Sequence, residues 1–162
     1  MRVVFLFCGL CLGLVTTGQS NLFNQLRTII ADTANKYAKF RGPLKSGRNG
    51  LDTTFLSTMQ VEGTSDNEID RAGWDNVYYW YYNAIIADSV KFNKAKKISD
   101  EWKRKIEKLF GSTFTVTKYK VVDFNPASYG WSFMCNGRSV ISIWVMPLKE
   151  KGAVLNRVFL SL

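Results

Sequence analysis

The chain has 162 residues, with 22 lysines and arginines against 13 aspartates and glutamates, and a formal net charge of +9. It contains no histidine and three cysteines, which excludes Ser-His-Asp and Cys-His catalysis and every zinc site that needs histidine. This length corresponds to one domain, and the basic balance favours anionic partners, although it can also serve solubility alone.

The first 18 residues are typical of a secretory signal peptide. Arg2 supplies a positive charge, residues 3–15 form an apolar run without any charge, and small residues follow before Gln19. The run is too short to cross a bilayer core, which needs roughly 20 residues. We therefore expect cleavage near Gly18-Gln19, a secreted or periplasmic protein, and a mature chain without a transmembrane segment.

Removal of this segment changes the chemistry of the chain. Cys8 and Cys11 leave with the signal, so only Cys135 remains and no internal disulfide can form. We interpret Cys135 as a small buried side chain rather than a reactive thiol. Loss of Arg2 lowers the net charge from +9 to +8. Residues 19–162 contain no linker, repeat or low-complexity tract, so we expect one self-supporting domain.

The first part of this domain contains patterns typical of a helix, a loop, a strand and a short helical turn. Apolar residues at helical spacing predict an amphipathic helix over 21–40, which Gly42-Pro43 ends. Turn-forming and basic residues predict a loop over 45–52, and alternation predicts a strand over 53–61. Ser65 and Glu68 have the spacing of a capping box, which predicts one or two helical turns before Gly73.

The middle of the chain contains five successive aromatic residues, Tyr78 to Tyr82. Such a run suits a pleated surface better than a helix, so we predict a strand over 76–87. Asp88 or Ser89 can then cap a second helix that Gly111 ends. The buried stripe of this helix is predicted to consist of Phe92, Ala95, Ile98, Trp102, Ile106 and Leu109.

The last third of the chain favours sheet. Asn136-Gly137 is a strong hairpin signal between strands 129–135 and 138–146. Further strands are predicted over 114–123 and 153–162. The element order α-β-β-α-β-β-β-β predicts an α+β fold, with a largely antiparallel sheet of about six strands and two amphipathic helices on one face.

Few residues support catalysis or metal binding. Asp66-x-Glu68-x-Asp70 is similar to the start of a calcium loop, but Arg71 and Val77 stand where that loop needs glycine and glutamate. We interpret it as an acidic helical turn. Asp75, Asp88 and Asp123 are too scattered to define a glycosidase pair. We therefore expect no metal, no cofactor and no catalytic residues that the sequence can name.

Two surfaces are candidates for binding. Alternation places Tyr78, Trp80 and Tyr82 on one face of the predicted strand, where exposed rings would bind sugars or a partner peptide. The alternative is that these rings pack in the core. The second candidate is the basic helix, whose exposed cations would contact an anionic surface: Lys94, Lys97, Arg104 and Lys108. The alternative is a solvated helix face, or one that meets the acidic segment over 62–75.

We therefore expect an exported, non-catalytic binding module of the cell envelope or extracellular space. Its partner would be an anionic polymer, a glycan or an envelope protein, since no specific nucleic-acid motif is present. One alternative is a small hydrolase that uses carboxylates with lysine or tyrosine. Another is an assembly subunit that adds a strand to a partner's sheet through an open edge near residues 153–162.

Overall fold

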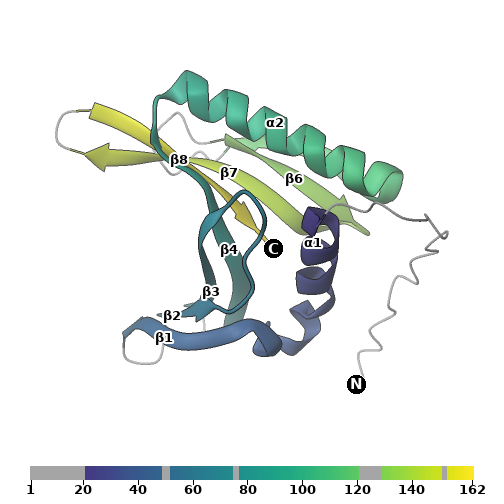
Figure 1. Ribbon diagram of the computed structural model, residues 1–162, viewed down its shortest axis with the longest axis vertical. Coiled ribbons are helices and arrows are strands. Elements are labelled where there is room, and N and C mark those ends of the chain that lie inside the picture. The colour runs from purple at the N-terminus through teal and green to yellow at the C-terminus, as the bar shows by residue number, and fades with distance from the viewer. Residues whose placement is uncertain (1–20, 49–51, 75–76, 121–128, 151–152) are drawn as a thin grey trace.

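The protein forms one curved antiparallel sheet with two helices (Figure 1). The computed structural model describes residues 21–48, 52–74, 77–120, 129–150 and 153–162. The predicted signal peptide lies outside these residues. The elements are α1 (Asn21–Ala31), η1 (Thr33–Asn35), η2 (Ala38–Phe40), β1 (Arg41–Arg48), β2 (Asp52–Ser57), β3 (Ser65–Trp74), β4 (Val77–Val90), α2 (Phe92–Phe110), η3 (Gly111–Thr113), β5 (Thr115–Lys120), β6 (Tyr129–Cys135), β7 (Arg138–Glu150) and β8 (Ala153–Ser161).

The topology divides into two equivalent halves. One helix followed by four strands, α1 with β1–β4, is succeeded by another helix followed by four strands, α2 with β5–β8. The strand order in the sheet is β1-β2-β3-β4-β8-β7-β6-β5, which is symmetric about the β4–β8 pair. The two halves therefore join through their last strands, and β1 and β5 form the outer edges.

The α+β class is confirmed, but the prediction of about six strands in the order α-β-β-α-β-β-β-β is wrong. Two strands, β1 and β3, were missed. β1 occupies part of the predicted loop because bulges let its glycines and its proline pair with β2. β3 replaces the predicted helical turns, since its backbone pairs with β2 and β4 on both sides. Cross-strand pairing therefore overrides the local capping-box signal.

The helix predicted over 21–40 is too long. α1 ends at Ala31, and Lys36 and Tyr37 then adopt positive φ angles of 57° and 54° between two short 3₁₀ turns. The periodic signal continues past the true end because Tyr37 and Phe40 still enter the core. Helical spacing therefore identified Tyr37 and Phe40 as buried while placing them in the wrong element.

Three other predictions are confirmed. The aromatic run is a strand, the second helix extends over Phe92–Phe110, and Asn136-Gly137 forms the turn between β6 and β7. Both turn residues have positive φ, at 50° and 74°, as this hairpin type requires. The predicted strand over 153–162 is β8, which lies between β4 and β7 in the middle of the sheet.

Both helices bury residues in the same core cluster. Leu22, Leu26 and Ile29 enter it from α1, and Ala95, Trp102 and Ile106 enter it from α2. α2 packs against β8, β7, β4 and β6, and the rings of Phe23 and Phe110 connect the two helices at a centroid distance of 5.1 Å. Helix-facing side chains of the central strands belong to the same cluster: Tyr82, Ala84, Ile141, Ile143, Val145, Val158 and Leu160.

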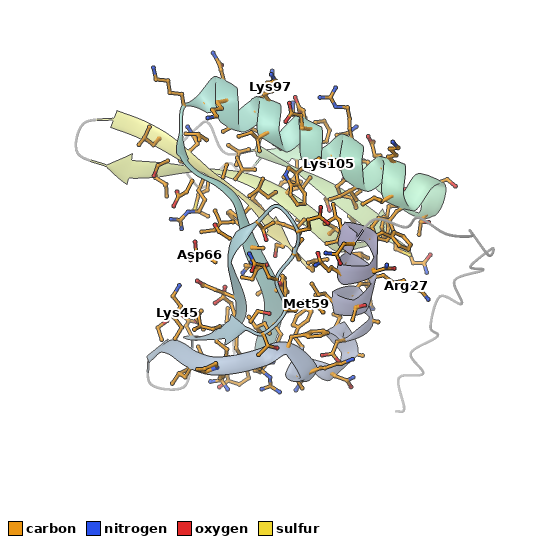
Figure 2. The ribbon with its side chains drawn as sticks, in the orientation of Figure 1. Arg27, Lys45, Met59, Asp66, Lys97 and Lys105 are labelled. Atoms are coloured by element: carbon orange, nitrogen blue, oxygen red, sulfur yellow. The ribbon has the colours of Figure 1, made fainter. Side chains whose placement is uncertain are left out.

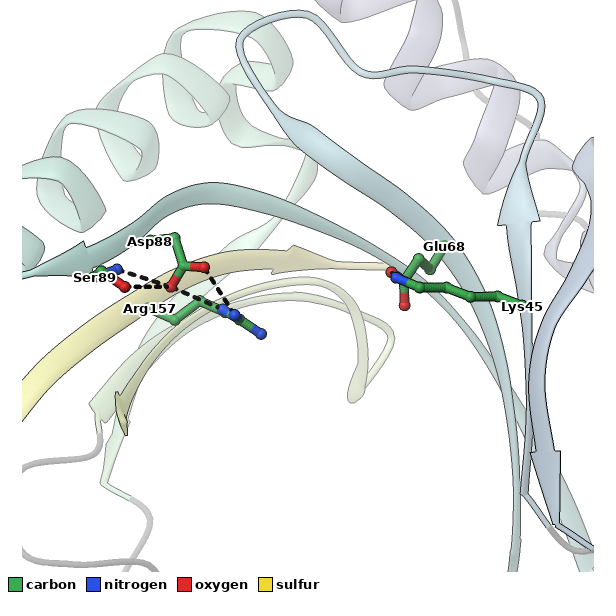
Figure 3. A network of polar contacts seen from close by, with 5 residues as sticks. All are labelled: Lys45, Glu68, Asp88, Ser89 and Arg157. Atoms are coloured by element: carbon green, nitrogen blue, oxygen red, sulfur yellow. Dashed lines mark hydrogen bonds and ion pairs between the residues drawn. The ribbon is translucent and has the colours of Figure 1, made fainter. Parts of the chain in front are cut away.

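The opposite face of the sheet carries two ion pairs. Arg157 on β8 donates two hydrogen bonds to Asp88 on β4, at 3.1 and 2.8 Å, and Lys45 on β1 contacts Glu68 on β3. The guanidinium of Arg157 holds the pKa of Asp88 below its usual range. Figure 3 shows both pairs beneath the arched strands, on the side away from the helices. Among the described residues, one face of the sheet is covered by the helices, and the other carries these ion pairs together with a stack of Trp144 on Phe159.

Candidate functional site

The three aromatic residues predicted to bind as a group do not share one environment. Tyr82 is fully buried, Trp80 is half-buried, and Tyr78 is exposed. All three lie on the helix-facing side of β4, so burial increases as the strand runs under the helices. The prediction of an exposed ladder of three rings is therefore wrong for Tyr82, because its ring belongs to the core.

Tyr82 has a structural role in a buried polar network. Its hydroxyl lies 2.6 Å from the carbonyl oxygen of Met59 and 2.8 Å from Oδ1 of Asn67. Asn67 Oδ1 also accepts hydrogen bonds from the backbone N–H of Val61 and from the Thr64 hydroxyl. Burial raises the pKa of Tyr82 to about 12. This network anchors the β2–β3 connection to the middle of the sheet.

Trp80 is held in a column of rings and guanidinium groups. Its ring stacks on Phe55 at 6.3 Å, and the Arg41 guanidinium lies 4.8 Å from its centroid. Arg71 lies 5.0 Å from the ring of Tyr78 and 5.9 Å from that of Trp80. Each such contact contributes about 0.5–1 kcal/mol at an exposed site. Most of the surface of Trp80 is therefore buried in contacts within the protein.

The other face of β4 exposes rings that the sequence prediction did not select. Tyr79 and Tyr81 point away from the helices, and both are exposed, as is Val77 at the start of the strand. The alternation itself was read correctly. The sequence does not show which strands flank β4. Those neighbouring strands decide which residues of β4 are covered.

The four cations predicted on the second helix are all exposed. Lys94, Lys97, Arg104 and Lys108 lie on α2 away from its buried stripe, and Figure 2 shows Lys97 on this helix. The helical stretch and the residue before it carry seven exposed cations in all, which we call the α2 basic face: Lys91, Lys94, Lys96, Lys97, Arg104, Lys105 and Lys108.

The α2 basic face has no ion-pair partner in the described part of the chain. The three ion pairs found there are Lys45–Glu68, Lys103–Glu107 and Arg157–Asp88, and none includes a residue of the α2 basic face. On β3, Glu68 instead contacts Lys45, and Asp70 accepts hydrogen bonds from Thr54 and Asn83. Among the described residues, no ion pair therefore joins the acidic segment to the α2 basic face.

Comparison with known proteins found no matching family model, no similar curated protein and no similar solved structure. The chain's own surface chemistry is therefore the guide to its function. In that chemistry, Trp102 lies in the core beneath the basic face, with Lys105 Nζ 5.2 Å from its ring. The aromatic residue that α2 does expose is Phe92, at its first position. The α2 basic face is thus a charged surface rather than a stacking platform.

The described residues also contain a hollow of about 370 Å³ beside α1. Its one carboxylate, Asp32, accepts hydrogen bonds from the Lys39 backbone N–H and the Asn35 amide, so it stabilises the turn after α1. Within the described ranges, no three Asp, Glu, Cys or His side chains are grouped closely enough to hold a metal ion. Neither described helix is both long and apolar enough to cross a membrane. The hollow is lined by Asn24, Arg27, Thr28, Ala31, Asp32 and Lys39.

Proposed function

We propose that the protein is an exported, non-catalytic binding module that contacts a linear anionic polymer through the α2 basic face. The observation that supports this function is the set of seven exposed cations without an ion-pair partner among described residues. Free cations on one surface attract polyanions by long-range electrostatics and by release of the polymer's counterions. The N-terminal segment predicts that the protein is exported.

The spacing of the cations favours a polymer over a small anion. Lys94 and Lys108 are 14 positions apart on α2, which corresponds to about 21 Å along a helix axis. Lys97 and Arg104 lie between them. These charges follow a line and do not converge on one point, so they match repeated negative charges better than one phosphate or carboxylate.

The fold presents this line of charge on a fixed support. α2 is anchored by Ala95, Ser99, Trp102 and Ile106, which are buried on its opposite side. A helix fixed in this way does not have to order on binding, so the partner meets preformed positions and less conformational entropy is lost. The long side chains can still adjust to the partner.

The electrostatic model predicts a measurable dependence on salt. Each contact with a polyanion contributes about 0.7–0.9 to the slope of log K against log salt concentration. Four contacts therefore give a slope of about −3 to −4. A fourfold rise in salt concentration should then weaken binding by about 50- to 150-fold.

Charge reversal with a matched control tests this function. Heparin is the probe, and the variant is Lys97→Glu with Arg104→Glu. The control is Arg27→Glu with Lys36→Glu, two exposed cations on and after α1, which changes the net charge by the same amount. We expect the α2 variant to bind at least about tenfold more weakly while the control retains most of its affinity. Equal losses in both variants would show that binding follows net charge alone and would contradict the proposal.

A further inference from the structure

The acidic residues of α2 differ in their partners. Asp100 accepts a hydrogen bond from the indole N–H of Trp131 at 3.1 Å, and Glu107 accepts one from Lys103 at 2.7 Å. Glu101 is half-buried, and its side chain has neither a hydrogen bond nor an ion pair in the described part of the chain. Two of the three carboxylates on this helix therefore have partners within the fold, and Glu101 does not.

Glu101 lies in the middle of the α2 basic face. Residues three, four and seven positions apart lie on the same side of a helix. Five exposed cations of the α2 basic face stand at these spacings from Glu101: Lys94, Lys97, Arg104, Lys105 and Lys108. Figure 2 labels Lys97 and Lys105 on either side of this position. The centre of a strongly basic surface is therefore occupied by a carboxylate.

This carboxylate divides the line of cations into two groups. The charges along the line are two positive, one negative and two positive, at Lys94, Lys97, Glu101, Arg104 and Lys108. Successive positions are about 5 Å apart along the helix axis, whereas Lys97 and Arg104, which flank Glu101, are about 10 Å apart. A polymer with an anionic group on every unit would place one of them against Glu101, where two like charges repel each other.

A hydroxyl group suits Glu101 better than an anionic group does. An ionised carboxylate only accepts hydrogen bonds, so it needs a donor from the ligand. Sugar hydroxyls donate hydrogen bonds, whereas the ionised groups of a polyphosphate only accept them. The cations on either side form their strongest hydrogen bonds with carboxylate, sulfate or phosphate oxygens. A polysaccharide that carries anionic groups with free hydroxyls between them satisfies both requirements.

We propose that the polymer bound by the α2 basic face is an acidic polysaccharide in which uncharged, hydroxyl-bearing sugar units separate the anionic groups, and that Glu101 selects it. This inference rests on the proposed function of the same surface. The cations on each side of Glu101 bind an anionic group, and Glu101 accepts a hydrogen bond from the uncharged unit between them. The cations thus supply affinity, and Glu101 discriminates against polymers with continuous charge.

Three polymers of matched length test the proposal. Hyaluronan has carboxylates on alternate sugar units, heparin is densely sulfated, and polyphosphate has a charge on every unit and no hydroxyl along the chain. Glu101→Ala removes both the charge and the acceptor, and alanine has the highest helix propensity. Glu101→Gln removes the charge and keeps an acceptor oxygen. The matched control is Glu107→Ala, which makes the same change of charge on the same helix.

The two kinds of polymer should respond to Glu101→Ala in opposite directions. Loss of one like charge should tighten the binding of heparin and polyphosphate about fivefold. Loss of the acceptor should weaken the binding of hyaluronan about threefold. Glu101→Gln should give the same gain with heparin and polyphosphate while its hyaluronan affinity stays within about twofold of wild type. Glu107→Ala should change the affinity for all three polymers by one similar factor.

The selectivity of the variants decides the outcome. The inference is wrong if Glu101→Ala shifts all three affinities by the same factor as Glu107→Ala, because Glu101 then acts through net charge alone. It is also wrong if wild type does not bind hyaluronan, or if Glu101→Ala leaves the hyaluronan affinity unchanged. Failure of the proposed function gives a different result, in which Lys97→Glu with Arg104→Glu weakens the binding of none of the polymers.

Discussion

Replacing Tyr82 with phenylalanine removes one hydroxyl from the buried network at the centre of the fold. The ring stays the same size, so the substitution leaves no cavity comparable to a lost side chain. The hydroxyl contacts two acceptors, the Met59 carbonyl at 2.6 Å and Asn67 Oδ1 at 2.8 Å. It has one proton, so it donates to one of them at a time.

The expected loss of stability is modest because each acceptor keeps another donor. The Met59 carbonyl still accepts from the Ser57 hydroxyl at 2.8 Å, and Asn67 Oδ1 still accepts from the Val61 N–H at 3.0 Å. The substitution therefore costs about one net hydrogen bond, or about 1–1.5 kcal/mol at neutral pH. A buried acceptor left without any donor would cost up to about 3 kcal/mol.

Alkaline pH should reverse the difference in stability between the wild type and Tyr82→Phe. The pKa of Tyr82 is raised to about 12 in the folded state by burial, against about 10 in the unfolded chain. Below pH 10 the hydroxyl is neutral in both states, so its contribution to stability is fully present. Between pH 10 and 12 the unfolded state loses the proton first, which destabilises the wild type by up to about 2.7 kcal/mol. Tyr82→Phe has no hydroxyl to titrate at this position, so its stability does not fall for this reason.

Urea unfolding at a series of pH values tests both parts of the prediction. Tyr78→Phe is the matched control, since Tyr78 is exposed on the same strand and its variant should stay within about 0.5 kcal/mol of wild type. The slope m should be the same in all three proteins. The reasoning is refuted if Tyr82→Phe matches Tyr78→Phe at pH 7, or if its deficit does not shrink as the pH approaches 12.

Two further predictions concern the sheet. Gly130→Ala should cost about 3 kcal/mol, because a Cβ there would lie 2.5 Å from the Ile143 carbonyl oxygen and 2.5 Å from the Tyr119 hydroxyl; thermal unfolding checks this against Gly47→Ala, whose Cβ meets nothing closer than 3.7 Å. Arg157→Gln should raise the pKa of Asp88 toward its ordinary value and change stability by no more than about 1 kcal/mol, since the pair is half-exposed. An NMR titration in which the pKa of Asp88 stays unchanged would contradict that cause.

The sequence predicted elements well where local geometry and side-chain chemistry agree. The Asn136-Gly137 turn requires positive φ angles that these residues adopt, so the β6–β7 hairpin followed from two residues. α2 followed from one apolar stripe of sustained helical period. In both cases the information is short-range, and no knowledge of the neighbouring elements is required.

The sequence failed where pairing with distant residues decides the structure. β3 is polar on one face because that face is not covered by the helices, so its alternation contains few apolar residues to detect. Asp70, for example, bonds to Thr54 on β2 and Asn83 on β4. The capping-box spacing of Ser65 and Glu68 therefore suggested a helix where two neighbouring strands impose a strand.

The same limit explains the outcome for the candidate sites. The cations of α2 could be chosen from the sequence because they lie opposite an apolar stripe on one helix. For β4, the alternation could be read from the sequence, but its pairing with β8 and with Leu162, which covers Tyr82, could not. The alternative edge near residues 153–162 is wrong for the same reason, because β8 is paired on both sides.

The salt dependence of heparin binding is the most direct test of the α2 basic face. With about four contacts, the wild type should give a log–log slope of about −3 to −4, and Lys97→Glu with Arg104→Glu should reduce it to about half of that value or less. Arg27→Glu with Lys36→Glu should leave the slope close to that of wild type. A wild-type affinity that does not change with salt, or a slope that the α2 substitutions leave unaltered, would contradict the assignment.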